Sequence, residues 1–141
     1  MKKIAVLIFI VGFTFSINAQ TIFGKWNSKN DDTGEVDSVI EVYKKNGKAF
    51  AKVIEIKDKI RQDAVCTLCE GENKGKKILG LDILTGLEKD GEEWSGGTIL
   101  DPRNGKVYKC YILLENTNKL KLRGYIGFSM FGKTAYWDRA E

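Results

Sequence analysis

The chain has 141 residues, a formal net charge of +4, 43% hydrophobic residues and three cysteines, but no histidine. Without histidine, Ser-His-Asp and Cys-His catalytic systems are excluded, and the commonest general base near neutral pH is missing. The charges are mixed along the chain and form no basic stripe, which argues against nucleic acid as a partner.

Residues 1–19 have the pattern of a secretory signal peptide. Lys2 and Lys3 precede an apolar run over residues 4–15, and Ala19 puts a small residue at the expected cleavage position. The run is well short of the roughly 20 residues that a membrane-spanning helix needs. We therefore expect export to the periplasm or beyond, cleavage after residue 19, and no transmembrane segment in the single domain that residues 20–141 would form.

The rest of the chain has the pattern of an all-β domain. Runs rich in β-branched and aromatic residues are bounded by turn signals such as Asn46-Gly47 and Asp90-Gly91. The longest connection, over residues 58–77, contains at most a short turn near residues 59–65. Eight strands are predicted, over residues 23–27, 36–45, 48–57, 78–89, 92–100, 106–115, 119–126 and 133–139.

Eight antiparallel strands joined by short hairpins can remove their exposed edges by closing on themselves. A β-sandwich is the alternative, but it would usually need longer connections that cross between sheets. The sequence therefore predicts one eight-stranded up-and-down antiparallel barrel with a long Cys-containing loop. Trp26 in the first strand and Arg139 in the last would then be neighbours, and their stacking would stabilise the closed base.

An ordered set of short motifs resembles one family over nearly all of residues 20–141. The motifs are Gly24-Lys25-Trp26, Thr33-Gly34-Glu35, Cys66-Thr67-Leu68-Cys69, Ile78-Leu79-Gly80 and the runs at 94–102, 105–108 and 122–127. Together they resemble the secreted bacterial family catalogued as domain of unknown function 2147. The opening G-x-W and the late Arg are also similar to those of the lipocalin, avidin and fatty-acid-binding group. The resemblance implies a lipocalin-like barrel, export, and no established activity.

The three cysteines allow several interpretations. Cys66 and Cys69 lie in the long loop, and Cys110 lies in phase with the apolar residues of its strand, so it should face the interior. A disulfide, local or to Cys110, is favoured in an exported protein. A redox-active pair is less favoured, because low-pKa C-x-x-C thiols usually begin a helix. Zinc is less favoured still, because its fourth ligand would have to be a carboxylate such as Glu70 or Glu72, or a residue of a partner protein. We expect no metal and no cofactor.

The barrel interior is the main candidate site, because eight strands enclose either packed side chains or one small ligand. The acidic cluster Asp31, Asp32, Glu35 and Asp37 is explained by a solvated turn. We therefore identify no catalytic residues, and an enzyme is less expected than a binding protein. The alternating pattern predicts twelve lining residues: Ile40, Val42, Phe50, Ile54, Leu81, Ile83, Trp94, Tyr108, Ile112, Leu120, Leu122 and Tyr136.

Three functional hypotheses follow. The first is an exported protein that binds a small apolar or amphipathic ligand in the barrel, with the Cys66–Cys69 loop as a lid. It requires a cavity of at least a few hundred Å³. The second is an envelope interaction or structural module with a solid barrel. Its loop 127–132, which carries Phe128, Met130 and Phe131, would contact a partner protein or a membrane surface. The third is a thiol-dependent redox or metal protein that uses the three cysteines.

Overall fold

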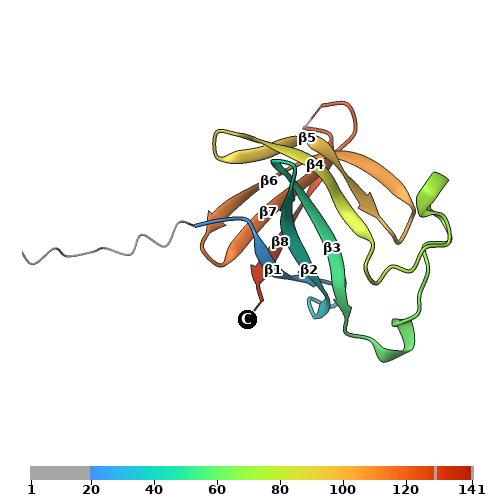
Figure 1. The fold of residues 1–141 in the computed structure, drawn as a ribbon. Helices are drawn as coiled ribbons and strands as arrows, with labels where there is room; N and C mark the ends of the chain where they lie inside the picture. Colours follow the sequence, from blue (N-terminus) through green and yellow to red (C-terminus); the bar gives the residue numbers. More distant parts are fainter. Residues whose placement is uncertain (1–19, 129, 141) are drawn as a thin grey trace, which may run out of the picture.

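The computed structural model describes residues 20–128 and 130–140, so the signal-peptide prediction for residues 1–19 lies outside the described residues. Within this part of the chain, eight antiparallel strands follow one another around a closed barrel, and the last returns to the first (Figure 1). The predicted up-and-down barrel is therefore confirmed. The strands are β1 (Gly24–Lys29), β2 (Val36–Lys45), β3 (Lys48–Ile56), β4 (Asp82–Asp90), β5 (Glu93–Asp101), β6 (Lys106–Asn116), β7 (Lys119–Tyr125) and β8 (Gly132–Arg139).

The turn chemistry explains the hairpins and one corrected boundary. Asn46 and Gly47 take φ values of 52° and 77°, the positive values that a tight hairpin between β2 and β3 requires. The fourth strand begins at Asp82 and not at Ile78, because a turn precedes it. In that turn the Leu81 N–H donates to the Ile78 carbonyl at 3.0 Å, and Gly80 has a φ of 88°.

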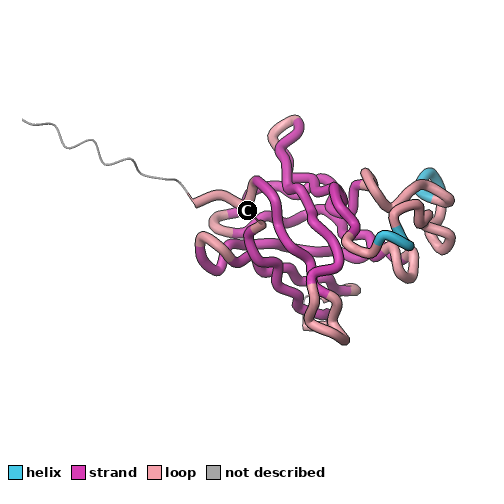
Figure 2. The backbone as a smooth tube through the Cα atoms, turned by 90° about the horizontal axis from the view of Figure 1, so that it is seen from below, coloured by secondary structure: helices cyan, strands magenta, loops and turns pink. Residues whose placement is uncertain are grey.

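The connections alternate between the two ends of the barrel. Short turns at 46–47, 91–92 and 117–118 lie at one end, which we call the base, with residues 20–23. Loops at 30–35, 57–81, 102–105 and 126–131 surround the other end, which we call the mouth. The 57–81 loop carries two 3-10 turns, η1 (Lys59–Arg61) and η2 (Gly71–Asn73), and extends to one side of the barrel (Figure 2).

The base is closed by Trp26 and Arg139. The Trp26 side chain is fully buried, and its Nε1 donates to the Ile22 carbonyl at 2.8 Å. The guanidinium carbon of Arg139 lies 4.0 Å from the centroid of the Trp26 ring, which is the stacked arrangement expected from the sequence. The same guanidinium donates to the carbonyl oxygens of Phe23, Thr21 and Thr117 at 2.9–3.1 Å. It therefore ties the N-terminal segment to the β6–β7 turn.

Three tryptophans dominate the core. Trp26, Trp94 and Trp137 are buried in one cluster with leucine, isoleucine and valine side chains from the surrounding strands. On β3 the residues that face these rings are small, because Ala49 and Ala51 are both fully buried. Large rings from β1, β5 and β8 and small side chains from β3 therefore share one core cluster.

A second, smaller cluster fixes the 57–81 loop to the outer face of β5. Cys66 and Cys69 form a disulfide and are buried with Leu81 and Leu100. A side chain at Gly105 would overlap this loop, because a Cβ atom there would lie 1.9 Å from the Leu68 carbonyl oxygen. The disulfide therefore belongs to a segment that is packed against the β5–β6 turn.

Candidate binding cavity

A cavity of about 960 Å³ occupies the mouth half of the barrel and continues along the junction of β8 with its neighbours as far as Lys119, Tyr136 and Asp138. Its lining includes side chains from every described strand, β1 to β8, but not Trp26 or Trp94 of the filled base. The apolar part of the wall and floor is formed by Ile40, Val53, Ile83, Ile99, Leu122 and Trp137. The barrel is therefore packed at its base and hollow at its mouth.

Gly124 contributes to this space by having no side chain. It lies on β7 among the cavity residues, opposite Cys110 on β6 and Lys133 on β8. A Cβ atom at this position would come within 3.4 Å of Ile99 and 3.7 Å of Tyr108, the two residues that line the neighbouring wall. A larger side chain at Gly124 would therefore grow into the cavity.

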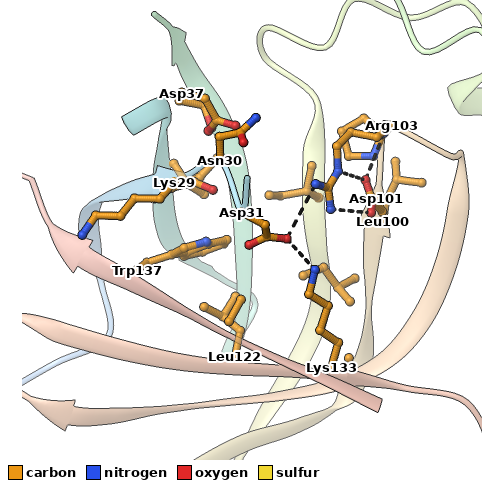
Figure 3. Close-up of a pocket in the computed structure, with 18 of the residues that line it drawn as sticks. Lys29, Asn30, Asp31, Asp37, Leu100, Asp101, Arg103, Leu122, Lys133 and Trp137 are labelled. Atoms are coloured by element: carbon orange, nitrogen blue, oxygen red, sulfur yellow. Dashed lines mark hydrogen bonds and ion pairs between the residues drawn. The ribbon is translucent and has the colours of Figure 1, made fainter. Parts of the chain in front are cut away.

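Charged side chains from three loops or strand ends meet across the mouth (Figure 3). Lys133 forms an ion pair and hydrogen bond with Asp31, and Arg103 approaches the same carboxylate at 3.8 Å. Arg103 also donates two hydrogen bonds to Asp101, from Nε at 3.0 Å and from Nη2 at 2.9 Å. We call Asp31, Lys133, Arg103 and Asp101 the mouth network.

Hydrogen bonds within the mouth network shift the pKa values of Asp31, Asp101 and Arg103. The hydrogen bond from Lys133 lowers the pKa of Asp31, more than the partial burial of this carboxyl group raises it. Burial raises the pKa of Asp101, but hydrogen bonds from Arg103 outweigh this effect and leave the pKa below its usual value. Hydrogen bonding to Asp101 in turn raises the pKa of Arg103. The charged forms of Asp31, Asp101 and Arg103 are therefore all stabilised by their partners.

The seam between β1 and β8 is the shortest in the barrel. In the part of the chain that the structure describes, these strands pair only at Trp26 with Arg139 and at Asn27 with Asp138. Beyond these pairs, the Lys29 ammonium and the Asp138 carboxylate form an ion pair across the seam. Both of these charged residues also border the cavity, so the cavity reaches the seam as well as the mouth.

The structure divides the twelve predicted lining residues into distinct groups. Ile40, Ile83, Tyr108 and Leu122 line the cavity. Val42, Trp94, Ile112 and Leu120 face inward but belong to the packed core and not to the cavity. Tyr136 borders the cavity on the side of the seam, yet it is 44% exposed and its ring lies 4.7 Å from the Lys119 ammonium.

Three of the predicted lining residues lie elsewhere. Phe50 is on the outer face of β3, where its ring stacks on Tyr43 with 5.8 Å between centroids. Ile54 is half-buried at a β-bulge and lines neither the core nor the cavity. Leu81 is buried, but in the cluster with the disulfide. The inward residues of β3 are instead Ala49, Ala51 and Val53.

Several cavity residues were not predicted from the sequence. Val53, Ile99 and Trp137 form apolar wall, and Lys133 and Arg103 stand at the mouth. Trp137 is in phase with Ala135 and Lys133, so the alternation of β8 contains the signal once its inward face is known. No comparable pattern marks Arg103, whose position depends on the β5–β6 turn.

The 57–81 loop borders the mouth, but not through its cysteines. Asp58, Arg61, Ala64 and Ile78 from this loop line the cavity, whereas Cys66 and Cys69 do not. The loop that was expected to act as a lid therefore borders the cavity through residues on either side of the disulfide, and not through Cys66 and Cys69 themselves. The disulfide holds the far part of the loop against Leu100, and the residues before it form part of the rim.

The three cysteines form one disulfide and one buried free thiol. The disulfide joins Cys66 to Cys69, so the alternative bridge to Cys110 is wrong. Cys110 is a free thiol, is 1% exposed, and faces the core as its strand phase predicts. Burial raises the pKa of the Cys110 thiol to about 12, so the reactive thiolate is not available near neutral pH.

We expect thiol titration to reflect this arrangement. With 5,5′-dithiobis(2-nitrobenzoate) at pH 8, the native protein should show no reactive thiol, and the denatured, unreduced protein should show one per chain, Cys110. The physical reason is that the reagent needs an accessible thiolate, and Cys110 offers neither access nor ionisation. A thiol that titrates near neutral pH in the native protein would revive the hypothesis of a thiol-dependent enzyme.

Within residues 20–128 and 130–140, no group of three or more Cys, Asp or Glu side chains is arranged to hold a metal ion. No helix in this described part of the chain combines the length and hydropathy that crossing a membrane requires.

Comparison with known proteins identifies a family and a fold. Residues 24–139 match the model of a family described as an uncharacterized protein conserved in bacteria, DUF2147. A solved structure, protein HP1028 from the human pathogen Helicobacter pylori, is described as belonging to the lipocalin family and is similar with a TM-score of 0.75. The two chains share 20% sequence identity over 86% of this chain and 84% of that chain, so the likeness is one of fold. No curated protein matches the chain.

Proposed function

The chain belongs to the DUF2147 family of bacterial proteins, and we propose that it binds a small apolar or amphipathic molecule in the mouth half of its barrel. The observation that carries the proposal is the cavity of about 960 Å³ above a packed base. Pockets that enclose small ligands span roughly 300–1,000 Å³ and are mostly apolar with a few placed polar groups. This cavity has a volume in that range, and its lining combines an apolar wall and floor with polar groups at the mouth.

The shape of the cavity suits a ligand with two different ends. Its floor consists of Ile40, Leu122 and Trp137, which offer only apolar contacts apart from the indole N–H. Its rim consists of charged groups that stay hydrated at the mouth. A ligand would bury its apolar part against the floor, where each methylene group removed from water contributes about 0.8 kcal/mol. Its polar part would remain beside the rim.

We also propose that the protein acts after export. The N-terminal pattern of residues 1–19 supports this, and so does the Cys66–Cys69 disulfide, because disulfides persist in oxidising compartments. Periplasmic and secreted locations both satisfy this condition.

Replacing Gly124 with Val tests the binding function. The added methyl groups should grow from the wall toward Ile99 and Tyr108 and fill part of the cavity. We expect the affinity of residues 20–141 for the neutral fluorophore N-phenyl-1-naphthylamine to fall about tenfold or more, which corresponds to about 1.4 kcal/mol of lost contact. Fluorescence titration measures the change.

The matched control is Lys121→Val, on the same strand but on the outer face, where Lys121 pairs with Leu113 and Tyr136. It should bind the fluorophore as the unmodified chain does. Circular dichroism should show that both variants keep the fold. If the two variants bind equally well, the fluorophore does not occupy the cavity and the proposal is wrong.

A second candidate function rests on the 126–131 loop. Ile126, Phe128, Met130 and Phe131 are 66–74% exposed, and Ile126 and Phe131 also border the cavity. Exposed apolar clusters of this kind mark interaction sites. We infer that the loop contacts an envelope protein. The barrel is not solid, so this contact would accompany ligand binding and not replace it.

The double substitution of Phe128 and Phe131 by Ser tests this contact. We expect it to abolish capture of the partner from an envelope extract by the immobilised chain, because the apolar contact area would be lost. The control is Ile60→Ser, which removes a side chain that is 93% exposed on another loop of the mouth. Equal capture by the double variant and the unmodified chain would contradict an interaction through this loop.

A further inference from the structure

Tyr108 carries a hydrogen-bond donor at the boundary between the apolar wall and the charged rim. Its side chain faces inward on β6, opposite Ile99 on β5, and it lines the cavity. Its Cβ atom lies beside the space above Gly124, and its hydroxyl reaches Asn104 in the β5–β6 turn. The hydroxyl therefore lies at the mouth end of this wall.

Asn104 in the β5–β6 turn determines the direction of the hydrogen bond with the Tyr108 hydroxyl. The Lys106 backbone N–H donates to Oδ1 of Asn104 at 2.9 Å, which leaves Nδ2 of Asn104 to face the Tyr108 hydroxyl. Nδ2 donates to the phenolic oxygen at 3.2 Å. An amide NH₂ can only donate, so the phenolic oxygen is the acceptor in this contact and its own proton is free for another acceptor. Among the described residues, no acceptor for this proton is found.

The charges around the cavity balance one another. Among the described residues that line it, five are cationic and five are anionic: Lys29, Arg61, Arg103, Lys119 and Lys133 against Asp31, Asp37, Asp58, Asp101 and Asp138. Lys133, Arg103 and Lys29 are each engaged with a carboxylate of the same set. The lining therefore carries no net charge, and three of its five cations are already paired with carboxylates.

Resting on the proposed binding function, we propose that the ligand is uncharged and accepts a hydrogen bond from the Tyr108 hydroxyl through a carbonyl or hydroxyl oxygen. Its apolar part packs against Ile40, Leu122 and Trp137. A ligand carboxylate would have to compete with Asp31 for Lys133 and Arg103, and either carboxylate would then lose a partner. A ligand ammonium would meet the same difficulty with the carboxylates. An uncharged oxygen uses the free phenolic proton and leaves the mouth network intact.

Displacement of N-phenyl-1-naphthylamine by three C12 compounds tests this inference at pH 7. The compounds are 2-dodecanone, dodecanoic acid and dodecylamine, which share an alkyl chain and differ in the charge of the head group. We expect 2-dodecanone to bind about tenfold more tightly than either ionic compound, because an ionised group that is partly desolvated without a partner is disfavoured. Tighter binding of the acid or the amine would overturn the inference.

Two pairs of variants test which residues cause the preference for an uncharged ligand. Tyr108→Phe should weaken 2-dodecanone by about threefold to tenfold, the value of one hydrogen bond. Tyr111→Phe, on the outer face of the same strand beside Tyr125, should leave the affinity for 2-dodecanone unchanged. Equal affinities of Tyr108→Phe and Tyr111→Phe for 2-dodecanone would overturn the role of the Tyr108 hydroxyl.

The second pair tests the mouth network. Asp31→Asn frees Lys133, whereas Arg103 keeps its partner Asp101. The substitution should increase the affinity for dodecanoic acid about threefold or more, as expected when an exposed ion pair is released. Asp32→Asn, at the next position of the same exposed loop, should not. No increase with Asp31→Asn would overturn the role of the network. If none of the three compounds displaces the fluorophore from the unmodified chain, the binding function itself fails, a result distinct from a wrong charge preference.

Discussion

Replacing Trp26 with Ala is expected to lower the free energy of unfolding by about 3–5 kcal/mol. The ring is fully buried, it is stacked under Arg139, and its Nε1 hydrogen bond holds the Ile22 carbonyl. Its removal would leave a void at the base and would take away the surface on which the Arg139 guanidinium lies. Both effects act on the seam with the fewest backbone pairs, between β1 and β8.

Urea unfolding of residues 20–141, followed by tryptophan fluorescence and circular dichroism, measures this loss. Phe128→Ala is the matched control, because it also removes an aromatic ring but from a side chain that is 74% exposed. That control should change stability by no more than about 0.5 kcal/mol. A loss below about 1 kcal/mol for Trp26→Ala would show that the base does not depend on this ring.

Gly105→Ala is expected to cost about 2–5 kcal/mol, although it adds a single methyl group. Gly105 has a φ of 71°, where a side chain adds about 1–2 kcal/mol of strain. The added Cβ would also lie 1.9 Å from the Leu68 carbonyl oxygen and 2.6 Å from the Cys69 nitrogen. The loop would have to move away, and overpacking of this kind typically costs a further 1–3 kcal/mol or so.

The control for this substitution is Gly34→Ala. Gly34 has a nearly equal φ of 73°, but a methyl group added there would meet no other atom within 4 Å, so the variant reports the backbone strain alone. We expect Gly105→Ala to lose more stability than Gly34→Ala in urea unfolding, and to make the 57–81 loop more sensitive to limited proteolysis. Equal losses would show that the loop is not held against the β5–β6 turn.

The barrel could be predicted from the sequence because the signals for strands and turns lie within short segments of the chain. Turn residues such as Asn46 and Gly47 indicate where the chain reverses in a hairpin. The alternation of apolar and polar residues along β6 correctly predicts that Cys110 and Ile112 face the interior. Short connections then leave little choice of strand order. These signals do not depend on how distant parts of the chain fit together.

The residues of β3 that face the interior of the barrel could not be predicted in the same way. Hydrophobicity favours Phe50 over Ala49 and Ala51 as an inward residue, yet the structure puts the alanines inside. The reason is the volume of the three tryptophans on other strands, which leaves room only for small side chains on β3. Leu81 was misplaced for a comparable reason, because the loop that buries it packs on the outside of the barrel.

The candidate site was predictable only in part. Ile40, Tyr108 and Leu122 follow from strand alternation. The mouth network does not, because Asp31 and Lys133 are 102 residues apart in the sequence and meet only when the barrel closes. A contact between two such side chains leaves no pattern within either segment.

The short seam between β1 and β8 also determines the order in which the fold can be completed. Trp26 and Arg139 pair across almost the full length of the domain, whereas every other strand pairs with its immediate successor. Contacts between distant segments cost the most loop-closure entropy and form late. Until β8 has formed, β1 lacks its second partner. The first strand is therefore an open edge during folding, and the pairing of Trp26 with Arg139 ends its exposure.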